Sequence, residues 1–160
     1  MRANIIILLT GLLISSLGAQ AMGFFKKCMF SAVEGTVLMA GKPVEGVKVK
    51  RRYLWGAAEE EKIDYTTTDS AGRFSFPALY SSSLSVSLLP LHEAGVNQNI
   101  VFEHDNKEFD GWSFRKRNYE LGGEKGKSPL NLVCDLTSSA QMNEDGGYLE
   151  DYYGVCKVVK

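Results

Sequence analysis

The sequence is poor in the residues that mark most catalytic and metal sites. Its 160 residues include two histidines and three cysteines, and neither a C-x-x-C nor an H-E-x-x-H pattern occurs. A thiol oxidoreductase, a zinc ribbon and a zinc protease therefore have no support. Neither charge is in surplus, since 18 Lys and Arg residues face 19 Asp and Glu residues. This balance argues against nucleic acid, and against an anionic membrane, as the main partner.

Catalytic motifs are equally scarce. The sequence has no G-x-S-x-G nucleophile elbow. His92 and His104 each have acidic neighbours, but two separate histidines do not make a set of convergent metal ligands, and both are expected in exposed connections. We predict a protein that is not an enzyme and that has no catalytic, cofactor-binding or metal-binding residues. The alternative left open is a small envelope hydrolase that uses His92 or His104.

An export signal is the first feature that is present. Arg2 precedes an apolar run at residues 5–17, and Ala19-Gln20-Ala21 has the small-x-small pattern of a leader-peptidase site. The pattern predicts a signal peptide at residues 1–21 and a mature chain that begins at Met22, which N-terminal mass analysis tests. The apolar run is shorter than the roughly 20 residues that span a bilayer. We therefore expect a periplasmic or secreted protein with no stable membrane anchor after cleavage, and retention of the segment as an anchor is the alternative.

Export places the three cysteines in an oxidising compartment, where at most two can pair within the chain. Cys134 and Cys156 lie in two apolar runs, residues 130–136 and 155–159, that are both typical of strands. The sequence therefore predicts a disulfide between Cys134 and Cys156. Cys28 is predicted to be free or to pair with another molecule.

Alternation of apolar and polar residues indicates an all-β protein. Runs of this kind recur at short intervals, and no amphipathic helical stretch is evident, so we predict a single antiparallel, Ig-like or transthyretin-like β-sandwich of about seven or eight strands. Nine candidate segments supply these seven or eight strands: residues 33–39, 47–54, 63–68, 73–76, 84–88, 99–103, 112–115, 130–136 and 154–159. The expected organisation is a signal peptide (1–21), a lead-in (22–31), the sandwich (32–136) and a C-terminal extension (137–160) that the disulfide ties back.

One predicted loop stands out as a binding surface. Residues 55–62 lack strand periodicity and combine Trp55, Gly56 and three consecutive glutamates. A large aromatic residue in such a loop suits partner contact, so Trp55 and the neighbouring Tyr53 form the candidate binding surface. The basic runs 50–52 and 115–117 are expected to be solvated strand surface, with the glutamates of the loop pairing to one of them.

Three motifs carry a resemblance to a known family. They are Val33-Glu34-Gly35-Thr36-Val37, Gly41-Lys42-Pro43-Val44-Glu45-Gly46-Val47-Lys48-Val49 and Thr68-Asp69-Ser70-Ala71-Gly72-Arg73-Phe74-Ser75-Phe76-Pro77. Residues 32–88 resemble carboxypeptidase-regulatory-like domains, which implies a transthyretin-like (prealbumin-like) β-sandwich. The later segments 107–112, 118–119, 132–136 and 154–156 resemble an uncharacterised family of small exported bacterial proteins. That likeness implies an exported sandwich with a cysteine pair, and it brings no catalytic residues.

These observations favour a non-enzymatic exported module that binds another protein or a glycan at its loops or sheet edges. A neutralising partner of a secreted toxin is a second possibility within the same class, suggested by small size and export. The ligand and the oligomeric state do not follow from the sequence.

Overall fold

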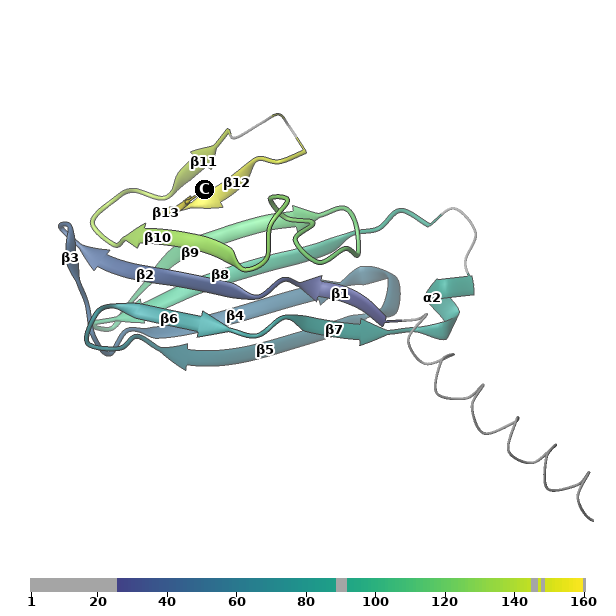
Figure 1. The fold of residues 1–160 in the computed structure, drawn as a ribbon, viewed down its shortest axis with the longest axis horizontal. Helices are drawn as coiled ribbons and strands as arrows, with labels where there is room; N and C mark the ends of the chain where they lie inside the picture. The colour runs from purple at the N-terminus through teal and green to yellow at the C-terminus, as the bar shows by residue number, and fades with distance from the viewer. Residues whose placement is uncertain (1–25, 89–91, 145–146, 148, 160) are drawn as a thin grey trace, which may run out of the picture.

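Two layers of β-sheet packed face to face make up the described part of the chain, as the computed structural model shows (Figure 1). The structure describes residues 26–88, 92–144, 147 and 149–159, so the predicted signal peptide lies outside the described residues. The all-β fold predicted from the alternating pattern is confirmed. One sheet has six strands, which run in the spatial order β11 (Gln141–Asn143), β12 (Tyr152–Gly154), β9 (Lys107–Lys116), β8 (Val96–His104), β4 (Lys48–Trp55) and β5 (Glu60–Thr67).

The second layer is built around β2 (Val33–Met39). This strand pairs with β10 (Leu130–Asp135) on one side, and with β3 (Lys42–Pro43) and β6 (Arg73–Phe76) on the other; β13 (Cys156–Val158) follows β10 at the edge. A further pair, β1 (Lys26–Phe30) and β7 (Leu79–Ser82), extends this layer. Phe30 lies opposite Leu79 and Val33 lies opposite Phe76, so the antiparallel ladder keeps its register across the interruption.

The described residues contain thirteen strands, more than the seven or eight predicted. Part of the difference comes from interruptions that split one long antiparallel ladder into the pairs β1–β7 and β2–β6. The rest comes from short strands, such as β3, that are too brief to show a period in the sequence. One pairing departs from the antiparallel expectation, because β2 and β10 run parallel, with Val33 opposite Leu130 and Val37 opposite Cys134.

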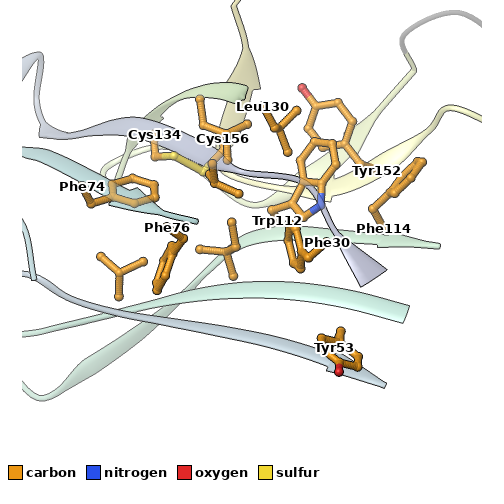
Figure 2. Packing of buried hydrophobic residues seen from close by; sticks show 14 of the residues in the cluster. Phe30, Tyr53, Phe74, Phe76, Trp112, Phe114, Leu130, Cys134, Tyr152 and Cys156 are labelled. Carbon is orange, nitrogen blue, oxygen red and sulfur yellow. A yellow bond between two sulfur atoms is a disulfide. The ribbon is translucent and has the colours of Figure 1, made fainter. Parts of the chain in front are cut away.

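The core lies between the two layers and is rich in aromatic side chains (Figure 2). Alternate residues of each strand face it, as Val49, Tyr53 and Trp55 do from β4. Trp112 stacks on Tyr152 with ring centres 4.3 Å apart, and Phe74 meets Phe102 edge to face. Burial of these rings supplies most of the driving force for folding.

The predicted turn at residues 69–72 is confirmed. Gly72 N donates to the carbonyl of Asp69 at 2.8 Å, and the Asp69 carboxylate accepts hydrogen bonds from the backbone N–H groups of Ala71 and Arg73. Gly72 has φ +71°, and a Cβ there would lie 2.5 Å from the carbonyl oxygen of Val37. Only glycine fits this position, because the backbone is left-handed and the space is filled.

The prediction of a strand at residues 84–88 is wrong, because these residues form a short helix, α2 (Leu84–Leu88). Ser83 begins the helix: its Oγ accepts a hydrogen bond from Val86 N at 3.3 Å, and its carbonyl accepts one from Ser87 N. Val86 is buried while Leu84 and Leu88 are exposed. The serines that made the sequence alternate therefore cap and continue a helical turn.

The ends of the described chain are more closely integrated than predicted. The expected lead-in contains β1, in which Cys28, Met29 and Phe30 are buried. The expected extension contributes β11 and β12 to the six-stranded sheet and β13 to the other layer. Among the described residues, no helix is long and apolar enough to cross a membrane.

The predicted disulfide is confirmed. Cys134 on β10 lies directly opposite Cys156 on β13, the two are bonded, and Cys28 is free and buried. The bond closes a loop with a sequence separation of 22 residues. Replacing both cysteines by alanine is expected to lower the free energy of unfolding by about 3 kcal/mol, because the unfolded chain regains loop entropy.

Urea denaturation with and without reductant measures this effect. The control is Cys28→Ala, whose stability should respond to reductant as the wild type does. A double variant with the same urea midpoint as the oxidised wild type would contradict the prediction.

Candidate functional site

The predicted binding residues, Tyr53 and Trp55, do not lie on a surface. Both belong to β4 and are fully buried. Trp55 Nε1 donates a hydrogen bond to the Tyr119 hydroxyl at 3.0 Å, and the two rings meet edge to face. The prediction of a binding surface at these residues is wrong, because β4 continues to Trp55 and its inward-facing positions enter the core.

The glutamates of the predicted loop explain this outcome. The connection between β4 and β5 is short, a 3-10 turn η1 (Gly56–Ala58) followed by Glu59, and β5 starts at Glu60. The Glu60 carboxylate accepts hydrogen bonds from the hydroxyls of Tyr53 and Ser81. Burial and the nearby Glu60 carboxylate together raise the pKa of Tyr53, so its hydroxyl stays protonated. Glu61 forms an ion pair with Arg52, as the sequence suggested for this acidic run.

The two histidines lie at opposite ends of β8. His92 precedes the strand and contacts the Tyr119 hydroxyl at 3.2 Å, whereas His104 ends the strand beside Asp105. Nine residues of strand separate the two ends by about 27 Å, so the histidines cannot share one reaction centre. Within the described ranges, no group of three or more His, Cys, Asp or Glu residues is placed to hold a metal ion.

A buried polar cluster is the first feature that the sequence did not indicate. It consists of Ser31, Gln98, Lys116 and Glu124, all almost fully inaccessible. The Glu124 carboxylate lies 3.2 Å from Lys116 Nζ and accepts hydrogen bonds from Ser31 Oγ at 2.5 Å and Gln98 Nε2 at 2.7 Å. Burial alone would raise the pKa of Glu124, but Lys116 and these donors outweigh it and lower the pKa below its ordinary value.

The polar cluster fixes the loop that follows β9 against the sheet. Gly122 N donates to Ser31 Oγ at 2.8 Å, and Gln98 Nε2 also donates to the Met29 carbonyl. Arg51 is likewise buried, with Asp64 bound to its guanidinium and the Phe76 ring 4.4 Å away. The basic runs 50–52 and 115–117 were expected on the surface, but each has its middle residue, Arg51 or Lys116, in the interior. These groups are inaccessible to a ligand, so we assign them a structural role.

An open groove on the outer face of the second layer is a candidate binding site. Its volume is about 570 Å³. Outward-facing side chains of β2, β6 and β10 form the floor, and the end of β5 forms one wall; the lining side chains are Glu34, Thr36, Thr66, Thr67, Asp69, Arg73, Ser75, Asn131, Val133 and Val159. Gly35 lies between the outward-facing Glu34 and Thr36, and its lack of a side chain leaves room beneath the groove for the Phe74 ring, which a Cβ would approach to 2.5 Å.

The chemistry of the groove is mixed. Arg73 faces Asp69 at 3.5 Å, while Glu34 has no ion-pair partner among residues 26–159 that the structure describes. Threonine and serine hydroxyls lie beside the half-exposed Val133 and Val159. The sequence indicated which side chains of this site face outward. These are Glu34, Thr36, Ser75 and Asn131, which occupy the outward positions of predicted strands. The sequence did not show that these strands are neighbours.

The family model for a domain of unknown function, DUF6795, matches residues 33–139. The matched segment includes every strand from β2 to β10, and so the floor of the groove. No curated protein and no solved structure matches the chain significantly. The resemblance to carboxypeptidase-regulatory-like domains stays a prediction. Because the match covers most of the chain, the protein belongs to the DUF6795 family.

Proposed function

We propose that this chain is an exported, non-enzymatic binding module that holds a protein partner in the groove on the outer face of β2, β6 and β10. The observation that carries the proposal is the groove itself, a volume of about 570 Å³. It holds hydroxyls, exposed valines and the Glu34 carboxylate, which has no ion-pair partner in the described part of the chain. Hydrogen-bonding groups beside apolar side chains supply both kinds of contact that a protein–protein interface uses.

A protein suits the groove better than a glycan does. The aromatic ring nearest its floor, Phe74, is buried beneath Gly35. A sugar would therefore find no exposed aromatic face on which to stack among the lining residues. The Glu34 carboxylate would instead receive a basic side chain or backbone N–H groups of an extended segment, and Val133 would contact apolar side chains.

Site-specific photo-crosslinking in living cells tests the proposal. A benzophenone amino acid replaces Val133 in the groove or, as a matched control, Val101 on the outer face of the six-stranded sheet. We expect a protein adduct from position 133 and none from position 101. Adducts at both positions, or at neither, would count against the groove.

A second variant tests specificity. Ser75 is exposed and lies opposite Glu34, so Ser75→Arg fills the groove and neutralises its carboxylate with little effect on folding. We expect at least a tenfold loss of the adduct, about 1.4 kcal/mol in binding free energy, with the melting temperature unchanged. An undiminished adduct in a folded variant would show that the partner binds elsewhere.

A further inference from the structure

The helix α2 and the start of β1 lie at the same end of the sandwich (Figure 1), and exposed leucines belong to this end. Leu84 and Leu88 are 59% and 70% exposed, and their spacing puts them on one side of α2. Val86 anchors the helix in the core, so the two leucines are held in solvent by a fixed element. We call this region the α2 end.

Lysine and tyrosine side chains lie on β1 and β7, the strands that lead to this end of the sandwich, and on the loop after β9. Lys26 lies opposite Ser82, two residues before α2, and its Nζ is 4.3 Å from the Tyr80 ring centre. Lys27 Nζ is 5.1 Å from the ring centre of Tyr119, and Leu121, 55% exposed, follows in the same loop. Leucine, tyrosine and lysine together are the composition of side chains that lie at a membrane–water interface.

The chain path adds an independent reason. The apolar run at residues 5–17 ends nine residues before Lys26, and nine extended residues reach at most about 30 Å. While that run lies in a membrane, during export or as a retained anchor, Lys26 and the neighbouring α2 end are tethered within this distance of the lipid.

We propose that the α2 end faces the membrane and that Leu84 and Leu88 insert into the interfacial layer of a phospholipid bilayer. Glu59 follows η1, which lies beside α2, and Glu120 precedes Leu121 in the chain. These acidic residues offset the lysines, so the contact rests on apolar side chains rather than on net charge. Two leucines make a weak, reversible contact and not an anchor. This inference rests on the proposed export of the chain.

Such an orientation would leave the groove free for a partner. Glu60, at the start of β5, bonds to Ser81 beside the α2 end, whereas Thr67, at the end of β5, lines the groove. Seven residues of strand place these two positions about 24 Å apart. The groove therefore lies away from the lipid.

Lipid quenching of a fluorophore tests the orientation, with the chain as isolated from cells. The reporter is attached to Ser82→Cys at the α2 end or, as a control, to Lys42→Cys on β3; the native Cys28 is buried and the other cysteines are bonded. Vesicles of phosphatidylethanolamine and phosphatidylglycerol carry doxyl-labelled lipid. We expect quenching at position 82 and none at position 42; equal quenching at both, or none at either, would overturn the proposal.

The variant Leu84→Ser/Leu88→Ser then tests the leucines themselves. We expect about a tenfold weaker partition into the vesicles, with the adduct from position 133 unchanged. Unaltered partition of this variant would overturn the insertion of the leucines. Shielding of the fluorophore at position 82 in cells but not on vesicles would also overturn it, because a protein would then cover the α2 end. If the otherwise wild-type chain with the photoreactive residue at position 133 forms no adduct, that result counts against the groove and leaves the membrane proposal standing.

Discussion

Glu124→Gln is expected to lower the free energy of unfolding by about 3–5 kcal/mol, since it leaves the buried Lys116 ammonium without its counter-charge. The amide also places a donor where Glu124 accepts hydrogen bonds from Ser31 and Gln98. Chemical denaturation measures the loss. The matched control is Glu120→Gln in the same loop, where the side chain is exposed and the expected change is below about 0.5 kcal/mol.

The pH dependence of stability checks the cause. The pKa of Glu124 is lower in the folded chain than its ordinary value of 4.5. Its contribution is therefore complete above that value and is lost as the pH falls through the folded pKa. Glu124→Gln should lack this part of the acid-induced loss. Removing both charges, in Lys116→Met/Glu124→Gln, should restore part of the stability; a double variant no more stable than the single one would show that lost packing, not an unpaired charge, explains the effect.

Trp55→Ala is expected to destabilise the fold by about 3–5 kcal/mol, because it empties a fully buried site. The change also removes the hydrogen bond from Trp55 Nε1 to the Tyr119 hydroxyl. Thermal denaturation gives the size of the effect. Trp55→Phe keeps an aromatic ring in the site and should cost markedly less.

The same variants separate a core role from a binding role. At temperatures where Trp55→Ala remains folded, the adduct from position 133 should persist, because Trp55 does not line the groove. If Trp55→Ala keeps the wild-type melting temperature but loses the adduct, Trp55 has a binding role and not a core role.

The local pattern of the sequence was sufficient for several features. Alternation in residues 33–39 and 73–76 predicted strands that the structure contains, and Asp69 with Gly72 predicted the turn before β6. The Cys134–Cys156 pair followed from two apolar runs in a chain with three cysteines. Each of these depends on neighbours along the chain or on chemistry that allows few alternatives.

Other features depend on contacts between distant segments. Residues 84–88 alternate as a strand does, but Ser83 caps a helical turn and Val86 is buried in the core. The sequence placed Trp55 in a charged loop, whereas in the structure Glu60 and Glu61 bind residues of β4 and extend the strand pair to Trp55. Period two assigns residues to two faces of a strand, and it does not say whether a second element covers a face.

By itself, the sequence determined the all-β class, the turn at residues 69–72 and the disulfide, because these follow from side-chain alternation, turn chemistry and cysteine parity. Tertiary structure alone decided that Arg51, Lys116 and Glu124 are buried with partners, and that the outward residues of β2, β6 and β10 line one groove. The physical reason is that a charged side chain enters the interior only where a distant residue compensates it, and sheet order joins strands that lie far apart in the chain.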